Sequence, residues 1–250
     1  MRIFNRKRML QNRIQEERTK MDKEKIIEVK NLVKVYRDGN TFFKALNGVS
    51  LSINQGESVA IIGKSGSGKS TLMHLLAALD KPNEGEVFIN GQNIAKMKKR
   101  ALNKLRNQTF GFVFQQFFMN PKDTVLQNVI LPLKIAGVGS KKRKEIALKA
   151  LEAVELSDKA KNKASNLSGG QKQRVCVARA IVNSPKIIFA DEPTGNLDSK
   201  TSAKVEDLLF GLNKEKGITL VIVTHDEALA QKCDRQIRIQ DGQIISKGEN

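Results

Sequence analysis

The stretch that decides the fold is Gly63-Lys-Ser-Gly-Ser-Gly-Lys-Ser-Thr71, which directly follows the apolar run Ser58-Val-Ala-Ile-Ile62. Its spacing is that of a phosphate-binding loop, G-x-x-x-x-G-K-[ST]. Glycines let the backbone curl so that successive N–H groups point at one anion, and the helix expected to start near Lys69 adds partial positive charge there. Glycine-rich turns also serve packing alone, but a buried strand before the loop and a helix after it favour a nucleoside-triphosphate site.

The side chains of this loop have distinct expected roles. Lys69 can reach the terminal phosphates, and the hydroxyl of Ser70 can hold Mg²⁺. A nucleoside triphosphate, such as ATP, and Mg²⁺ are therefore the expected cofactors. The residues expected to bind nucleotide in the loop are Gly63, Lys64, Ser65, Gly66, Ser67, Gly68, Lys69, Ser70 and Thr71.

Composition narrows the class of protein. The chain has 250 residues, of which 40% are hydrophobic, enough for one large domain. No apolar run approaches the roughly 18 residues needed to span a bilayer. Cys176 and Cys233 lack the spacing of a metal or redox site and are expected to be reduced packing residues. The net charge of +18 suggests attraction to a polyanion, either nucleic acid or an anionic membrane face.

Residues 1–25 differ from the rest of the chain, being rich in Arg, Lys, Gln and Glu. If they are helical, Ile3, Leu10, Ile14 and Met21 fall on one stripe among basic residues, as in an amphipathic helix lying on a membrane or a partner. The alternative is a disordered tail, or a true start at Met21.

Patterning from residue 26 to 250 predicts an α/β domain with a mostly parallel sheet. Alternating runs at 26–36 and 44–53, joined by a turn at 37–40, predict an antiparallel hairpin at its start. A helical insert is expected at about 115–182. Further strands are expected at 58–62, 85–89, 109–114, 186–190, 218–223, 235–239 and 243–246, and helices at 69–79, 124–156 with a break near 137–140, 170–182, 200–214 and 226–232.

Three more groups of polar residues stand at the ends of expected strands, where ligands bind in open α/β sheets. Asp191 is placed to hold Mg²⁺, directly or through water, and Glu192 to accept a proton from a water that attacks the γ-phosphate. His225 follows another buried strand and is expected to orient that water. Gln115 can touch Mg²⁺ or water. His74, inside the helix after the loop, is expected to pack.

The sequence Leu167-Ser-Gly-Gly-Gln171 opens another helix and makes a second anion-seeking turn, called here the serine–glycine turn (residues 168–171). One nucleotide does not need two such cradles. A head-to-tail dimer resolves this, because each phosphate loop then faces the partner's serine–glycine turn. The residues expected to bind nucleotide from the partner subunit are Ser168, Gly169, Gly170 and Gln171.

These motifs, in this order, resemble the ATPase subunit of an ATP-binding cassette (ABC) transporter over nearly the whole chain. The resemblance implies that Tyr36 stacks on adenine, that Asn196 lies in the D-loop, and that Glu192, His225, Lys69 and Gln115 serve catalysis. It also implies Mg²⁺ held by Ser70, Gln115 and Asp191. The implied partners are a second ATPase subunit and an integral membrane permease, so that the protein is peripheral on the cytoplasmic face of the membrane.

A subfamily is suggested by residues 110–117, 128–133 and 191–198, which resemble the macrolide-export and lipoprotein-release class. Such ATPases transmit mechanical motion to a permease. The segment Phe118-Met119-Asn120 departs from the aliphatic pair common in relatives, so the identity of the permease stays open. Two rivals exist. A soluble cassette ATPase acting on nucleic acid or ribosomes accounts for the charge but usually carries two cassettes or a coiled coil. A kinase leaves residues 167–171 unexplained.

Overall fold

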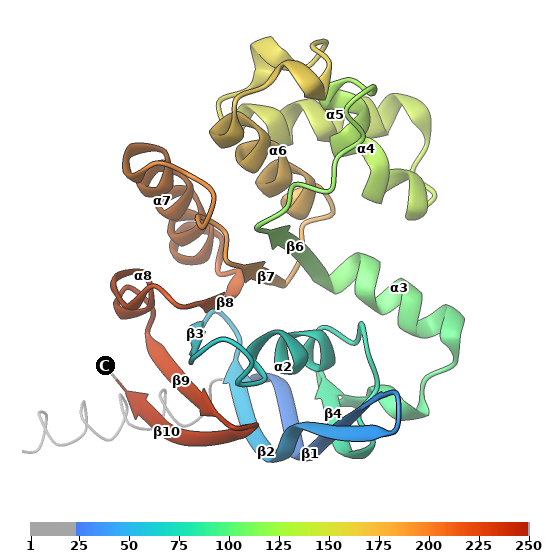
Figure 1. Cartoon of the computed structure of the whole chain (residues 1–250). Helices are drawn as coiled ribbons and strands as arrows, with labels where there is room; N and C mark the ends of the chain where they lie inside the picture. The colour runs from blue at the N-terminus through green and yellow to red at the C-terminus, as the bar shows by residue number, and fades with distance from the viewer. Residues whose placement is uncertain (1–23, 250) are drawn as a thin grey trace, which may run out of the picture.

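The computed structural model describes residues 24–249. The basic extension expected over residues 1–25 therefore lies almost wholly outside the described residues, and Lys25 already begins the first strand. Within the described part, no helix is long and apolar enough to cross a bilayer. Figure 1 shows two β-sheets in the lower half, with α2 between them, and a separate group of helices above.

The first sheet is antiparallel and begins with the predicted hairpin. Its strands are β1 (Lys25–Asp38), β2 (Thr41–Asn54), β4 (Glu84–Ile89) and β5 (Gln92–Asn93), in the order β2-β1-β4-β5. The hairpin is longer than the sequence indicated, because the turn needs only Gly39, at φ 56°, and Asn40. The strands therefore pair as far as Asp38 and Thr41.

The second sheet is the mostly parallel one. Its strands are β3 (Ser58–Ile62), β6 (Phe110–Phe114), β7 (Ile187–Asp191), β8 (Thr219–Thr224), β9 (Arg235–Gln240) and β10 (Gln243–Glu249), in the order β10-β9-β3-β8-β7-β6. Only the β9–β10 pair is antiparallel. Every residue of β3 and β8 is buried, as expected for parallel strands covered on both faces. The predicted α/β class is thus confirmed.

The helices cover the sheets and form the upper layer in Figure 1, where α4, α5 and α6 lie together. They are α2 (Lys69–Leu76), α3 (Lys99–Thr109), α4 (Val125–Ile135), α5 (Ser140–Glu152), α6 (Gly169–Ile181), α7 (Ser199–Lys216) and α8 (Glu227–Gln231), with 3₁₀ turns at Ile94–Lys96, Ser157–Lys159 and Ala164–Asn166. The α4–α6 group falls within the range 115–182 expected for the helical insert.

Two details of the expected helices were wrong. The helix expected over 69–79 ends at Leu76, because Ala78 takes a left-handed conformation at φ 55°. Helix α3 was not predicted, and it absorbs Thr109, which the sequence placed in a strand. Four of its eleven residues are Lys or Arg, and only Leu102 and Leu105 supply large apolar contact to the core.

Helix α2 is fixed between the sheets. Its side chains Leu72, Met73, Leu75 and Leu76 are all fully buried in a core shared with β1, β2, β3 and β4. Burying side chains of this size contributes about 2 kcal/mol each. The start of α2, and the loop that precedes it, therefore have a firmly determined position.

Candidate nucleotide-binding site

The loop between β3 and α2 has the backbone that its glycines make possible. Gly63, Gly66 and Gly68 have φ of 156°, 78° and 105°. A Cβ on Gly63 would lie 2.2 Å from the carbonyl oxygen of Ile239, and one on Gly68 would lie 2.5 Å from that of Ala45. A side chain at position 63 would push the loop away from β9, and one at position 68 would push it away from β2. Close approach of the backbone therefore requires glycine at both positions.

Lys69 closes the loop in this structure. Its Nζ donates hydrogen bonds to the carbonyl oxygens of Gly63 and Lys64, each at 2.9 Å. The hydroxyl of Ser67 is buried under the loop and has no hydrogen-bond partner within residues 24–249. The ammonium group and the curled backbone together present positive charge and N–H groups to one space, as an anion site requires.

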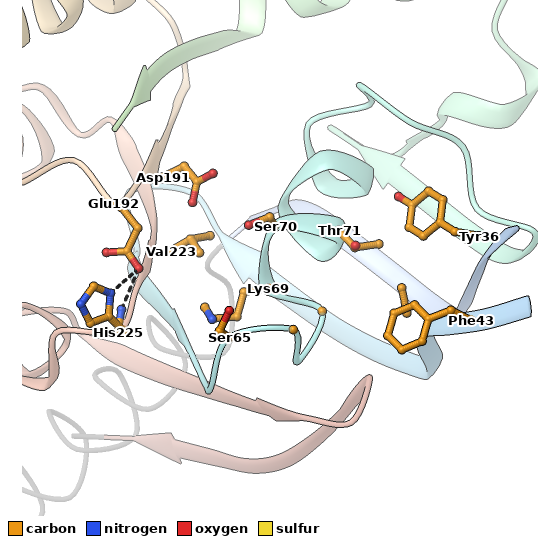
Figure 2. Close-up of a pocket in the computed structure, with 13 residues that line it drawn as sticks. Tyr36, Phe43, Ser65, Lys69, Ser70, Thr71, Asp191, Glu192, Val223 and His225 are labelled. Carbon is orange, nitrogen blue, oxygen red and sulfur yellow. Dashed lines mark hydrogen bonds and ion pairs between the residues drawn. The ribbon is translucent and has the colours of Figure 1, made fainter. Parts of the chain in front are cut away.

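That space is a cavity of about 590 Å³. Figure 2 shows the loop at the base of the cavity. Asp191 and Glu192, called here the acidic pair, lie with His225 at one end, and the rings of Tyr36 and Phe43 lie at the other. The expected site residues that line it are Tyr36, Ser65, Gly66, Gly68, Lys69, Ser70, Thr71, Asp191, Glu192 and His225. Gly63, Lys64 and Ser67 belong to the loop without lining the cavity. Gln115 and the serine–glycine turn do not line it.

Asp191 ends β7 and points into the cavity beside Ser70, as Figure 2 shows. Burial, and then the charge of Glu192, raise the pKa of this carboxyl above its ordinary value, while His74 and Lys69 act in the opposite direction. No hydrogen-bond donor in the described chain pairs with it. A half-buried carboxylate without a donor, next to a hydroxyl, fits Mg²⁺, which takes one or two protein oxygens and completes its shell with phosphate and water.

The carboxylate of Glu192 is held by β8 and the residue after it. The backbone N–H and the Nδ1 atom of His225 lie 3.0 and 2.8 Å from Oε1, and the Thr224 hydroxyl donates to Oε2 at 3.1 Å. Glu192 also has a positive φ of 45°, which is strained for a side chain of this size. The strained backbone aims the side chain into the cavity, and the three hydrogen bonds fix its carboxylate there.

Gln115 follows β6 directly, and its side chain is hydrogen-bonded to Asn196 and does not line the cavity. Its Nε2 donates to Oδ1 of Asn196 at 3.2 Å, and Nδ2 of Asn196 donates to the Gln115 carbonyl oxygen at 3.2 Å. A Cβ on Gly195 would lie 3.0 Å from the Gln115 amide nitrogen. The paired amides leave Oε1 of Gln115 available toward a metal or water.

Tyr36 is fixed at the aromatic end of the cavity. Its hydroxyl donates to Asp80 at 2.9 Å, and Lys34 forms an ion pair with the same carboxylate at 2.8 Å. Burial, and then the bond to Asp80, raise the pKa of the Tyr36 hydroxyl. Burial opposes ionisation of Asp80, but hydrogen bonds from Lys34, the Lys81 N–H and Tyr36 outweigh it and lower the pKa of Asp80. The ring is therefore oriented before any ligand arrives.

Phe43 is a lining residue that sequence reasoning missed. It pairs directly with Tyr36 across the hairpin, so both side chains stand on the same face. Its ring is 56% exposed and faces the cavity beside Tyr36 in Figure 2. The expected strand began at residue 44, whereas β2 begins at Thr41, so the expected strand left out Phe43 by one residue. Extending the hairpin to a two-residue turn at 39–40 would have revealed the pair.

The serine–glycine turn caps α6. The Ser168 hydroxyl accepts from the N–H of Gln171 at 3.3 Å, and the Gln171 side chain accepts from the N–H of Ser168 at 3.0 Å. A Cβ on Gly170 would lie 2.1 Å from the Thr201 methyl group. No residue of this turn lines the nucleotide cavity of the same chain.

The two cysteines are structural, as expected. Burial raises the pKa of the Cys176 thiol to about 11 and that of the Cys233 thiol to about 12. The thiol of Cys176 lies 3.2 Å from the carbonyl oxygen of Phe117. No group of three or more His, Cys, Asp or Glu side chains in the described chain is arranged to hold a metal.

Comparison with known proteins identifies the family. The ABC transporter family model matches residues 46–195. The chain is 46% identical over 220 residues to an uncharacterized ABC transporter ATP-binding protein, YknY of Bacillus subtilis, covering 88% of this chain and 95% of the relative. It is 45% identical over 222 residues to the lipoprotein-releasing system ATP-binding protein LolD of Syntrophus aciditrophicus, covering 88% and 99%.

Solved structures agree with the fold. A dimeric structure of MJ0796, described as a bacterial ABC transporter cassette, has a TM-score of 0.82 and 45% identity, covering 89% of this chain and 98% of that one. The same cassette in a post-hydrolysis state with ADP and Pi also has a TM-score of 0.82, with 44% identity over the same shares. With its phosphate loop, acidic strand end and serine–glycine turn in place, the chain belongs to the ABC transporter family as an ATP-binding, ATP-hydrolysing subunit.

Proposed function

We propose that this chain is the ATPase subunit of a membrane complex, in which two copies close head to tail on ATP and drive a permease of the mechanical-transmission type. The observation that carries the proposal is the division of the site. The nucleotide cavity holds the phosphate loop, the acidic pair and His225, whereas the serine–glycine turn lies outside it. Each copy then completes the other's site, as two-fold symmetry allows.

The residue roles follow from the geometry. Lys69 exchanges its two carbonyl partners for phosphate oxygens, and the loop N–H groups hold the same charge. Glu192 accepts the proton of the attacking water, and His225, now bonded to Glu192, turns toward the γ-phosphate and orients that water. Ser70 and Asp191, with Gln115, would hold Mg²⁺, which when bound neutralises phosphate charge. Tyr36 and Phe43 stack on the nucleobase.

A second groove supplies the contact to the permease. It has a volume of about 490 Å³ and lies where α3, β6, α4 and α6 meet. Exposed apolar side chains line it, among them Phe118 at 66% and Ile135 at 70% exposure, together with Leu79 and Leu131. An apolar cluster open to solvent marks a binding surface, and the size of this groove suits one short helix of a partner.

The relatives suggest the kind of complex. The permease of our proposal releases lipoproteins or exports peptides or drugs, and the relatives named for a lipoprotein-releasing system support the first of these. In such a complex the chain is peripheral, on the cytoplasmic face of the membrane, and held there by its permease.

Affinity purification from detergent-solubilised native membranes tests the proposal. A tagged Glu192→Gln chain, trapped with ATP, is expected to recover a multi-span permease in stoichiometric amount. In a tagged chain that retains Glu192, the double change Leu131→Glu with Ile135→Glu should abolish recovery of the permease and leave ATP hydrolysis intact. Ile245 is an exposed aliphatic residue outside the groove, so Ile245→Glu should preserve both. Recovery of ribosomes or nucleic acid with no membrane protein would contradict it.

A further inference from the structure

The positive charge of this chain is concentrated in one stretch of the sequence, which includes the helices α3 and α4 that help to line the apolar groove. Between residues 87 and 144 the sequence contains twelve Lys or Arg and a single acidic residue, Asp123. Ten of these twelve cations lie in two groups, which we call the α3 cluster (Lys96, Lys98, Lys99, Arg100 and Lys104) and the α5 cluster (Lys134, Lys141, Lys142, Arg143 and Lys144). Most of the net charge of the chain therefore comes from one quarter of its length.

Each cluster has one residue next in sequence to the groove lining, since Lys104 follows Asn103 and Lys134 precedes Ile135. Helix α3 contributes Asn103, Arg106 and Asn107 to its lining, and α4 contributes Leu131 and Ile135. The α5 cluster begins at the end of α4 and continues into the first turn of α5, a few residues after Ile135. In Figure 1 the helices α3 and α4 lie on the side of the molecule away from α7.

These cations are not used by the fold. All of them except the partly covered Arg143 are exposed, and none forms an ion pair with any residue between 24 and 249. Neither α3 nor α5 has an acidic residue in its first turn, although that is where a carboxylate would stabilise a helix and a cation opposes its dipole. Lys99 and Arg100 in the first turn of α3, and Lys141 and Lys142 in the first turn of α5, therefore oppose the helix dipole and form no ion pair within the described residues.

We infer that this basic rim binds the anionic lipid headgroups that surround the permease, so that the ATPase docks on the membrane surface as well as on its partner protein. The inference rests on the proposed function for the permease in the groove. The exposed cations of both clusters have no carboxylate partner among the described residues, and headgroup phosphates would supply that negative charge. A surface for single-stranded nucleic acid would instead place aromatic rings among the cations, and the stretches 96–104 and 134–144 that hold the two clusters contain none.

Vesicle co-sedimentation of the full chain tests the inference. The wild-type chain is expected to bind vesicles of phosphatidylcholine with about 30% phosphatidylglycerol, to release as salt rises from about 0.1 to about 0.5 M, and to ignore vesicles of phosphatidylcholine alone. Lys98→Glu with Arg100→Glu, and Lys141→Glu with Lys142→Glu, should each weaken binding about tenfold or more. Lys214→Glu with Lys216→Glu on α7 is the matched control, since it changes the net charge equally.

Stability and activity are read on the same samples. The α5 pair places carboxylates in the first turn of a helix, so its melting temperature should equal or exceed that of the wild type while vesicle binding falls. Equal losses in the rim variants and the α7 control, or equal binding to neutral and anionic vesicles, would overturn the inference. So would RNA binding that the rim variants abolish in a chain that ignores both vesicles. A wild-type chain that binds anionic vesicles but hydrolyses no ATP would contradict the proposed function alone.

Discussion

The carboxylate of Glu192 and the imidazole of His225 are in direct contact, with 2.8 Å between Oε1 and Nδ1. They come from the ends of β7 and β8, which are neighbours in the sheet. The side chain of Glu192 is mostly covered, whereas that of His225 is largely exposed. The histidine side chain is therefore the partner that can move, and its release leaves Oε1 with only the His225 backbone N–H, so that this oxygen can also accept from the attacking water.

Replacing Glu192 by Gln tests the role of this carboxylate. An amide keeps the shape and can still accept from the Thr224 hydroxyl, but it cannot take a proton. We expect kcat to fall by about 10²-fold or more and the affinity for ATP to stay within about a factor of three, measured by phosphate release and by calorimetry.

Glu227→Gln is the matched control, because Glu227 is an exposed carboxylate nearby that pairs with Arg238. It should hydrolyse ATP at the wild-type rate. Near-normal hydrolysis by the Glu192→Gln chain would remove Glu192 from the role of base.

Phe43 should matter for nucleobase binding and Phe42 should not. Both rings are exposed, but only Phe43 lines the cavity beside Tyr36. Loss of one stacking face costs about 1 to 3 kcal/mol, so Phe43→Ala should raise the KM for ATP about fivefold or more with little change in kcat. An equal effect of Phe42→Ala would assign the loss to the hairpin as a whole.

Gly170 is expected to be intolerant of a methyl group for an identifiable reason. Its Cβ would lie 2.1 Å from Cγ2 of Thr201, whose hydroxyl donates to Asp198 at 2.6 Å and so holds that rotamer. Gly170→Ala should lower the free energy of unfolding by about 1 to 3 kcal/mol, measured in urea.

Thr201→Ser removes the clashing methyl group and keeps the hydroxyl, so it should restore most of that loss in the double variant. Gly169→Ala serves as the control, because its Cβ meets only Leu197 at an ordinary 3.7 Å. An unrescued double variant would mean that the strain lies in the backbone.

Both thiols should resist modification in the native chain. Burial raises the pKa of Cys176 to about 11, so only about one thiol in a thousand is ionised at pH 8. The ionised fraction of Cys233 is smaller still, because burial raises its pKa to about 12. We expect no reaction with a disulfide reagent until denaturant is added, and then two thiols per chain. Because ionisation increases with pH, the slow native reaction should accelerate about tenfold per pH unit. Rapid native labelling would show that the α6 region opens.

The sequence predicted those parts of the site whose residues can be recognised from their immediate neighbours in the chain. The phosphate loop, Asp191 and His225 each stand where a buried strand ends, and the ends of parallel strands meet at one edge of a sheet. Phe43 was missed because its role depends on the length of a hairpin, which the turn at Gly39 decides. Helix α3 was missed because its charges obscure the short apolar stripe of Leu102 and Leu105. The contact of Thr224 with Glu192 depends on strand order, which local patterns do not contain.

Mixing two inactive variants tests the shared site most directly. Lys69→Met damages only the phosphate loop, and Ser168→Glu damages only the serine–glycine turn, so each chain alone should hydrolyse almost no ATP. In a mixed head-to-tail dimer, one site combines an intact loop with an intact turn. The account predicts that ATP hydrolysis returns on mixing and increases with the square of total chain concentration while dimers are scarce. A mixture as inactive as its components, with both chains folded and the Ser168→Glu chain still binding ATP, would contradict it.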